Sequence, residues 1–588
     1  MKRVAYLLAA VVLSGCGGEP EPKAKPAGLN ELVEGYFDQS LALQPMTATL
    51  VGESRFNHVF GNGYSEAALE TAEAMDKAAL EGLSTVDRDS LSGSDKLSYD
   101  MFLWELKLAE QGRQFPFYML PVNQFGSDLM TFFQLGSGSS AQPFDSLEDY
   151  ERFALRAEGL PAWIDTAIMR MRQGMEDEVT LPRVLVERVI EQLRPHLVST
   201  PEQSLLWSPV ASLPLGLGES RSGIEGRYSK LIMGTVVPAL TRFSHFLDKE
   251  YLPSARASSG LWDLPNGKAW YRHQIKVHTT TQMTADQIHR LGLKEVARIH
   301  DEMRQIQQQL GIKGGLRDFL NHMATEPGYF FAEPEQLVAG YEALKGDINA
   351  LLPAYFDLMP RADYEVREVE AYRAKSAAGA SYEPPAIDGS RPGIFYINTY
   401  NLKAQPKWGM TTLSLHEAAP GHHFQIALQQ ELEGLPRFRR FNYSTAFVEG
   451  WALYAEYLGI EMGLFADPLQ HFGKLSDELL RAMRLVVDTG LHAKGWSREQ
   501  AIAYMLESSA MAESDVRAEV ERYMALPGQA LAYKVGQLKI LALRQHAQEA
   551  LGDKFDIRQF HRQVLGQGAM PLALLEQRID EWIQSRPG

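Results

Sequence analysis

The chain has 588 residues, 45% of them hydrophobic and 22% charged, which is enough apolar material for a large buried core. The formal net charge is −16, and this acidic balance argues against nucleic acid as a partner, because phosphate binding needs clustered Lys and Arg. Length alone allows two to four domains, and we expect fewer, since large helical folds often form one continuous body.

The N-terminus has the features of a bacterial lipoprotein signal. A charged start is followed by a short apolar run at residues 5–13, too short to span a bilayer as a stable anchor. The tetrapeptide LSGC that follows resembles a lipoprotein cleavage site and ends at Cys16, the only cysteine of the chain. We expect cleavage before Cys16 and lipid attachment to it, with Gly17 favouring the outer membrane and a position facing the periplasm. The alternative is an ordinary secretory signal with an incidental cysteine.

These features divide the chain into a signal peptide (1–15), a flexible tether (16–28) and a helical domain (29–588). Within the domain, segment 200–225 is rich in Pro, Ser and Gly and is a candidate boundary between two lobes. No other apolar run is long enough to cross a membrane.

Most of the domain has the apolar periodicity of helices. The clearest start is Thr284, where Gln287 three residues later completes a capping box, and the glycine-containing segment 311–315 ends that helix. The long predicted helices are 148–175, 285–310, 469–493 and 530–551. The clearest strand is 393–399, rich in aromatic and β-branched residues, whereas 374–392 is predicted to be a loop. The expected fold is mainly α, with one small sheet.

A histidine-rich segment, HEAAPGHH at residues 416–423, carries the residue types of a zinc hydrolase. Such a site needs neutral imidazoles and a carboxylate as ligands, one open position for water, and a base. The usual arrangement is H-E-x-x-H on one helix, with the Glu directed toward the open position. Here His416 and Glu417 match the first half of this pattern. Pro420 stands at the place of the second histidine.

The unusual spacing requires a broken helix. On an unbroken helix His416 and His423 would lie about 10 Å apart at ~1.5 Å rise per residue, too far for one ion with bonds of about 2 Å. Pro420 removes a helical N–H and Gly421 permits unusual dihedral angles, so both favour a break. A bulge at this point would swing His422 back, and we therefore predict His422 as the second ligand. His423 is the alternative ligand, or a residue that binds substrate or orients the site.

The third ligand is expected to be a glutamate on a following helix. Glu449 lies between Val448 and an Ala-rich run, where a core residue would be expected, and a buried carboxylate needs a partner such as a metal ion. Glu456 lies seven residues further on and shares the same helix face, so we expect it to support the site without binding the ion.

These segments resemble known metallopeptidases. The segment from His416 to His422 resembles the H-E-x-G-H helix of gluzincin-type oligopeptidases and carboxypeptidases with two residues inserted, and the segment from Glu449 resembles the N-E-G-F-A segment of zinc aminopeptidases. The whole pattern is more similar still to a bacterial family, domain of unknown function 885, from about residue 30 to the end. The motifs that carry this likeness are H-E-x-x-P-G-H-H-x-Q at 416–425, LGLKEVARI at 291–299, and PGQA at 527–530 with Tyr533 and Gly536. The resemblance implies a large helical zinc-peptidase-like fold with one small β-sheet beside the metal-binding helix.

The resemblance also implies a residue that stabilises the oxyanion. Oligopeptidases of this type use a Tyr or His from a late helix, and Tyr533 resembles that position, with Tyr523 as the alternative. A phenol hydroxyl is a suitable donor to a developing oxyanion. A buried structural tyrosine is the other interpretation of either residue.

Together these features predict a zinc-dependent hydrolase that cleaves peptide bonds in short oligopeptides and, by a weaker inference, acts as a carboxypeptidase. We expect one Zn²⁺ on His416, His422 and Glu449, where it would lower the pKa of its water toward ~7. Glu417 would take the proton and pass it to the leaving amine, and Tyr533 would hold the oxyanion.

Two other functions remain open, an amide hydrolase that acts on cell-wall or modified peptides and a non-enzymatic metal-binding lipoprotein of the envelope. Glu417 argues against the second, because a protein that only binds has no use for a base beside the metal. The strand at 393–399 precedes the metal segment, and we expect it to be an edge strand that pairs with extended substrate, with a purely structural strand as the alternative.

Overall fold

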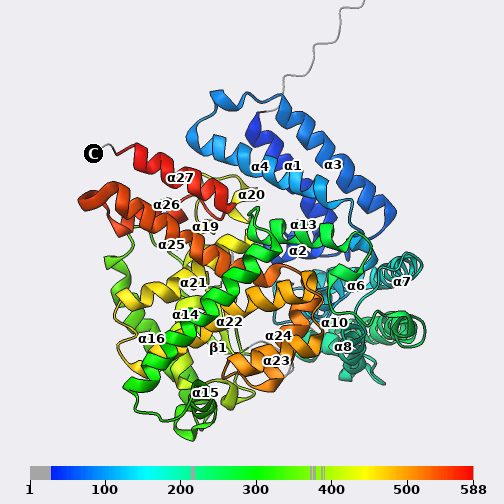
Figure 1. The fold of residues 1–588 in the computed structure, drawn as a ribbon. Coiled ribbons are helices and arrows are strands. Elements are labelled where there is room, and N and C mark those ends of the chain that lie inside the picture. The colour runs from blue at the N-terminus through cyan, green and yellow to red at the C-terminus, as the bar shows by residue number, and fades with distance from the viewer. Residues whose placement is uncertain are drawn as a thin grey trace, which may run out of the picture.

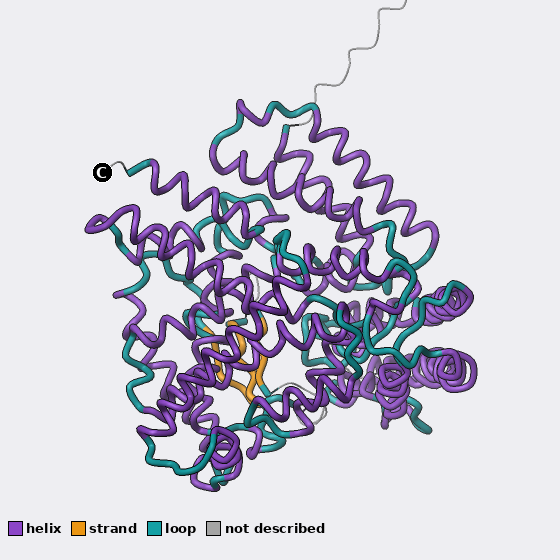
Figure 2. The backbone as a smooth tube through the Cα atoms, in the orientation of Figure 1, coloured by secondary structure: helices purple, strands orange, loops and turns teal. Residues whose placement is uncertain are grey.

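The computed structural model describes residues 28–213, 219–370, 374, 379–385, 389 and 391–586. The predicted signal peptide, Cys16 and all of the predicted tether except its last residue lie outside the described residues. In the described ranges the protein is mainly α, as predicted, with one small sheet among the helices (Figure 2). None of the described helices is both long enough and apolar enough to span a bilayer.

The N-terminal half of the described chain is almost entirely helical (Figure 1). Its α-helices are α1 (Leu29–Leu43), α2 (Pro45–Leu50), α3 (Glu66–Ser84), α4 (Gly93–Gly112), α5 (Asp128–Leu135), α6 (Leu147–Glu158), α7 (Leu160–Glu176), α8 (Arg183–Leu193), α9 (Ser208–Ala211), α10 (Glu219–Leu231), α11 (Val237–Phe246), α12 (Leu252–Ser254) and α13 (Gly267–Thr279). Helices α1, α3 and α4 share a hydrophobic core with the last helix, α27 (Leu572–Gln584). Helix α27 therefore lies beside α4, so elements from the two ends of the described chain pack together (Figure 1).

The C-terminal half contains the sheet and the helices around it. Its elements are α14 (Ala285–Gln309), α15 (Leu316–Thr325), α16 (Pro334–Leu351), β1 (Tyr364–Glu368), β2 (Ala380–Glu383), β3 (Gly393–Ile397), α18 (Met410–Glu417), α19 (His422–Gln430), α20 (Arg437–Arg440), α21 (Thr445–Glu461), α22 (Pro468–Ala493), α23 (Arg498–Ser508), α24 (Glu513–Ala525), α25 (Ala532–Leu551) and α26 (Ile557–Leu565). Buried residues of α18, α19, α21 and β3 belong to the same core as α1 and α27. The candidate site is thus anchored in the largest core.

Helices α5 to α11 are built around a second core, which spans the candidate lobe boundary at 200–225. Leu206 and Val210 precede residues 214–218, which lie outside the described residues, and Tyr228 and Leu231 follow them. All four side chains are buried in the second core. The apolar core is therefore continuous across the described parts of this segment.

The predicted helices are present, with one interruption. The helix expected at 148–175 is two helices, because α6 ends at Glu158 and α7 begins at Leu160. Gly159 lies between them, where a Cβ atom would stand 2.7 Å from Cβ of Phe60. The capping box at Thr284 is confirmed, since its side chain accepts a hydrogen bond from the backbone N–H of Gln287. The helices predicted at 469–493 and 530–551 are confirmed as α22 and α25.

The small sheet has the strand order β1-β3-β2. Strand β3 confirms the strand predicted at 393–399, but the expectation that it is an edge strand is wrong. It pairs in parallel with β1, with Gly393 opposite Tyr364, and antiparallel with β2, with Ile397 opposite Ala380. All five residues of β3 are buried, and an unbroken apolar run of this kind is typical of a strand covered on both faces. Among the described strands, β1 and β2 form the edges of the sheet, and β2 is the edge strand next to the site.

Strand β2 lies in the segment 374–392, for which a loop was expected. Its sequence ASYE lacks the apolar run that marks β3, and its four residues are only partly buried. Strand β2 forms because β3 offers it a row of backbone partners, an interaction that local sequence does not encode. Residues 375–378, 386–388 and 390 of this segment lie outside the described residues.

Candidate metal centre

The helix that carries the histidine-rich segment is broken where Pro420 and Gly421 predict a break. Helix α18 ends at Glu417 and α19 begins at His422. The carbonyl oxygen of Pro420 accepts a hydrogen bond of 2.7 Å from the indole N–H of Trp451 on α21, which ties the break to the helix that carries Glu449. The peptide bond before Pro420 is cis.

Gly421 is required by close packing at this break. A Cβ atom at position 421 would lie 2.0 Å from the carbonyl oxygen of His416 and 2.3 Å from that of Leu415. Real Cβ atoms do not approach backbone oxygens so closely, so only glycine lets α19 begin directly against the end of α18. This contact turns the imidazole of His422 toward that of His416, with the ring centres 4.7 Å apart.

Replacing Gly421 with alanine should therefore displace α18 from α19. We expect a lower melting temperature, since overpacking typically costs about 1–3 kcal/mol, together with weaker metal binding. Scanning fluorimetry and a zinc titration against a competing chelator measure the two effects. Gly434→Ala is the matched control, because a Cβ atom there meets nothing within 4 Å. A Gly421→Ala protein with parental zinc affinity would contradict this account of the break.

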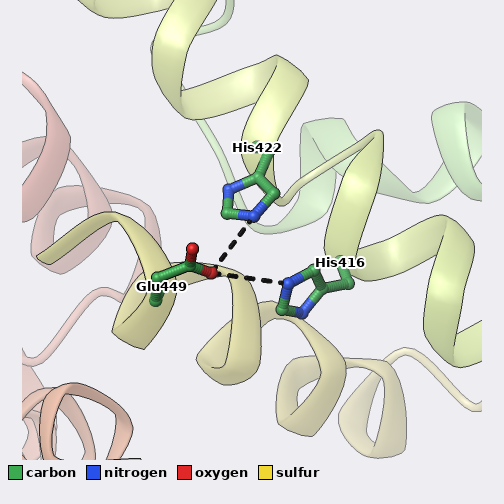
Figure 3. Close-up of side chains that lie close together, drawn as sticks. All are labelled: His416, His422 and Glu449. Carbon is green, nitrogen blue, oxygen red and sulfur yellow. Dashed lines mark ion pairs between the residues drawn. The ribbon is translucent and has the colours of Figure 1, made fainter. Parts of the chain in front are cut away.

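Three predicted ligands converge on one point (Figure 3). Oε2 of Glu449 lies 3.3 Å from Nε2 of His422 and 3.7 Å from Nε2 of His416. One ligand atom from each residue lies within 4.8 Å of the other two, and all three side chains are buried. The structure thus brings together His416, His422 and Glu449 as they were predicted.

The surroundings of these atoms suit a metal ion. Oε2 of Glu449 is buried and has no hydrogen-bond partner among the described residues, so a cation would satisfy it. Nδ1 of His416 lies 2.7 Å from Oε1 of Glu456, which fixes the ring so that Nε2 turns toward Glu449. Glu456 therefore takes the supporting position expected for it. Two imidazoles and one carboxylate leave a fourth position open, as in catalytic zinc sites.

The pKa values of His416 and Glu449 are shifted by their contacts within this group. Burial alone would lower the pKa of His416, but the nearby carboxylates of Glu449 and Glu456 raise that pKa to about 9. Burial alone would raise the pKa of Glu449, but the neighbouring imidazoles of His422 and His416 hold that pKa well below its usual range. The electrostatics of the pocket therefore favour a positive charge between the three side chains.

His423, the alternative ligand, points away from this centre. Its Nδ1 lies 3.1 Å from the hydroxyl of Tyr382 on β2, and its Nε2 lies 3.1 Å from the carbonyl oxygen of Ala362. Burial lowers its pKa to about 4, so the ring is neutral. It packs between α19 and the sheet. Both ring nitrogens have partners, so His422 is the better candidate for the second ligand.

The position of Glu449 depends on close contact between α21 and α25. A Cβ atom at Gly450 would lie 2.5 Å from the backbone of Gly536, and one at Gly536 would lie 1.9 Å from the carbonyl oxygen of Ala446. The two glycines let the helices touch, and Glu449 and Tyr533 come to the same cavity as a result. The hydroxyl of Tyr443 donates to Oε1 of Glu449 at 3.2 Å, which leaves Oε2 for the imidazoles.

The centre opens into a cavity of about 1140 Å³. Its wall includes the three candidate ligands His416, His422 and Glu449, together with Glu417 and the edge strand β2. Residues 49–52 and 140–141 of the N-terminal half also line it. Glu417 is half-buried and faces this cavity directly beside the ligand His416. A carboxylate, a group that could hold a metal ion and a large cavity therefore meet in one place.

Of the two tyrosines considered for the oxyanion, Tyr533 faces the cavity. Its ring centre lies 6.4 Å from that of His416, and its hydroxyl oxygen accepts a hydrogen bond of 3.0 Å from Nη2 of Arg522. Because the oxygen accepts from Arg522, the hydroxyl proton stays available for a ligand in the cavity. Tyr523 is buried elsewhere, and its hydroxyl donates to Glu519 at 2.5 Å.

Three residues of the site were not predicted from the sequence: Tyr443, Arg481 and Arg522. Tyr443 lies in a short loop before α21, where nothing in the spacing marks it. Arg481 had a detectable signal, because it falls on the apolar face of α22, and a charged residue at a core position needs a partner.

Fold and centre together define the class, a mainly helical protein with a buried His-His-Glu group that can hold a metal ion. The model of the family "Bacterial protein of unknown function (DUF885)" matches residues 45–579, and the chain belongs to this family. The likeness inferred from the sequence motifs is thereby confirmed.

Two solved structures are similar over nearly their whole lengths. The crystal structure of the "putative lipoprotein from Colwellia psychrerythraea" is 30% identical, covers 95% of this chain and 99% of its own, and has a TM-score of 0.88. A "putative lipoprotein of unknown function from Shewanella oneidensis" is 19% identical, covers 94% of this chain and 99% of its own, and has a TM-score of 0.70, which shows the shared fold. No curated protein matches the chain in sequence.

Proposed function

We propose that the protein is a zinc-dependent hydrolase that cleaves peptide bonds in short oligopeptides. The observation that carries this proposal is the meeting of the triad His416, His422 and Glu449 with Glu417 on the wall of one cavity. Zinc bound there would supply a water of pKa ~7 and polarise a carbonyl group. A binding protein would need the three ligands but not the carboxylate beside them.

The other groups of the cavity have matching roles. Glu417 takes a proton from the attacking water and passes it to the amine nitrogen as the C–N bond breaks. The Tyr533 hydroxyl donates a hydrogen bond to the carbonyl oxygen as negative charge develops there, while Arg522 holds the phenol in place. Tyr443 and Glu456 keep Glu449 and His416 in the orientation that binds the ion.

Two features of the cavity favour a peptide as substrate. Strand β2 is an edge strand whose residues line the cavity, so an extended peptide can add to the sheet there, the role that was expected of β3. The volume of about 1140 Å³ lies just above the range of roughly 300–1,000 Å³ that suits small ligands, which fits a short peptide better than a folded protein. Within this class we favour release of residues from the C-terminal end.

The test is a cleavage assay of the purified full-length protein with added zinc. A mixture of unmodified peptides and, in parallel, soluble cell-wall peptide fragments are incubated with the protein and analysed by mass spectrometry. We expect cleavage of unmodified peptides that a chelator abolishes and zinc restores. Cleavage of cell-wall fragments alone would favour the amide hydrolase. Zinc binding without cleavage of either substrate would overturn the proposal and favour a binding protein.

We further propose that the protein is lipid-anchored in the bacterial envelope through Cys16. The lipoprotein-like tetrapeptide that ends at Cys16 and the likeness to a protein described as a lipoprotein support this location. We favour the outer membrane, facing the periplasm, because Gly17 follows the cysteine. Labelling of cells with a radioactive fatty acid tests the anchor. We expect the parental protein to take up label and Cys16→Ser not to, and equal uptake by the two proteins would contradict lipid attachment at Cys16.

A further inference from the structure

Four arginines line the cavity: Arg391, Arg440, Arg481 and Arg522. Arg481 comes from α22 and Arg522 from α24, and both border the same space as the metal ligands. Another arginine, Arg484, lies beneath them, with its guanidinium carbon 4.4 Å from the centre of the Tyr533 ring. This wall of the cavity is therefore rich in positive charge.

The charge of Arg481 is only partly matched. Its side chain is 8% exposed, its Nη1 lies 2.9 Å from Asp477, and its Nη2 lies 3.9 Å from Oε1 of Glu456. That oxygen of Glu456 already binds His416 at 2.7 Å. The Nε of Arg481 is buried and has no hydrogen-bond partner among the described residues. An anion in the cavity, which Arg481 lines, would balance the part of this buried charge that Asp477 and Glu456 leave unmatched.

Arg522 also shares its counter-charge. Its nearest carboxylate oxygen, on Glu519, lies 3.5 Å away, whereas Arg484 holds the other oxygen of Glu519 at 2.8 Å. One carboxylate thus serves two guanidinium groups. The neutral partners of Arg522 are Tyr533 at 3.0 Å and Gln529 at 3.1 Å. Arg522 is 24% exposed, so it can reach a ligand without leaving these partners.

We propose that Arg522, with Arg481 beside it, binds the free C-terminal carboxylate of the peptide substrate. The inference rests on the proposed function and deepens it, since it makes the enzyme one that removes residues from the C-terminal end. The positive charges here outnumber the carboxylates that pair with them. The guanidinium groups are those of Arg481, Arg484 and Arg522, and the carboxylates that do not also contact a candidate metal ligand are those of Asp477 and Glu519. The planar fork of a guanidinium matches the two oxygens of a carboxylate, and such charge-assisted bonds are roughly twice as strong as neutral ones.

The distances suit release of a short C-terminal fragment. The ring of Tyr533 lies 6.4 Å from that of the ligand His416, and Arg522 lies 3.0 Å from the Tyr533 hydroxyl. An extended peptide advances by about 3.3–3.6 Å per residue. Arg522 therefore lies within the length of a few extended peptide residues of the candidate ligand His416.

The experiment separates a C-terminal carboxylate from one on a side chain. Three peptides of one sequence are compared: the free acid, its C-terminal amide, and an amide that ends in glutamate. Their affinities are measured by calorimetry on full-length Glu417→Gln protein, which binds without turnover, and their cleavage is measured on the active protein. We expect the free acid to bind at least tenfold more tightly than either amide, and Arg522→Gln to abolish that preference.

Two comparisons distinguish binding from support of Tyr533. Tyr533→Phe should slow cleavage of the free-acid peptide and of its amide by the same factor. Arg522→Gln should instead weaken binding of the free-acid peptide more than binding of the amide. Arg440→Gln is the matched control, because Arg440 lines the same cavity but donates to the carbonyl oxygen of Gln430, and it should keep the preference. Arg481→Gln, checked for an unchanged melting temperature, should reduce the preference in part.

Equal affinity of the Glu417→Gln protein for the free acid and its C-terminal amide would overturn the inference. Binding of the glutamate amide as tightly as the free acid would overturn it too. Retention of the preference in Arg522→Gln would overturn it as well. In each of these cases, zinc-dependent cleavage of peptides would still support the proposed function. Absence of any peptide cleavage would instead count against the proposed function itself.

Discussion

Replacing Glu417 with glutamine should lower kcat by a factor on the order of 10²–10⁴ and leave the zinc content unchanged. The amide fills the same space beside His416 but cannot accept the proton of the attacking water. The three ligands His416, His422 and Glu449 stay in place, so the metal should remain bound. Steady-state cleavage of an unmodified peptide and elemental analysis of the same sample measure the two quantities together.

Glu433→Gln serves as the control for this charge change. Glu433 lies beyond the end of α19, its side chain is 77% exposed, and its ion pair with Arg361 has a separation of 3.5 Å. Exposed pairs of this kind contribute little, so kcat should stay at the parental value. Cleavage by Glu417→Gln at the parental rate would show that this carboxylate is not the base.

Replacing Glu449 with glutamine should weaken zinc binding by more than the roughly 10–100-fold that is typical when a supporting residue is lost. The change removes the only negative charge among the three ligands, and it leaves two buried imidazoles facing a neutral amide. In the parent, zinc at 1,000 times its Kd should stabilise the fold by about 4.1 kcal/mol, and at the same zinc concentration less than about 1.4 kcal/mol of this gain should remain in Glu449→Gln. Titration against a chelator and melting curves with and without zinc measure both effects.

Glu456→Gln gives the graded comparison. Glu456 touches the centre only through Nδ1 of His416, so its loss should weaken zinc binding by about 10–100-fold and leave a clear rise of melting temperature with zinc. An order of effects in which Glu456→Gln is the more damaging change would mean that Glu456, not Glu449, is the third ligand.

The local part of the site could be predicted from the sequence. Pro420 and Gly421 disfavour a continuous helix through their own covalent geometry, so the break between α18 and α19 and the choice of His422 over a residue four positions on followed from the chain itself. Glu449 could be predicted because a carboxylate at a core position needs a buried partner. The helices followed in the same way from apolar periodicity and from the capping box at Thr284.

Only the tertiary structure decided how distant segments meet. Whether β3 is central depends on β1 and β2, whose polar sequences form strands because β3 offers them partners. The direction of His423 is decided by Tyr382 on β2, and the approach of Tyr533 by the contact of Gly450 with Gly536. Arg522 and the metal ligands share one cavity although they are far apart in the chain. Helix caps, helix breaks and apolar periodicity depend on neighbouring residues and can therefore be predicted from the sequence. Strand order, side-chain direction and shared cavities depend on packing between elements that are far apart in the chain.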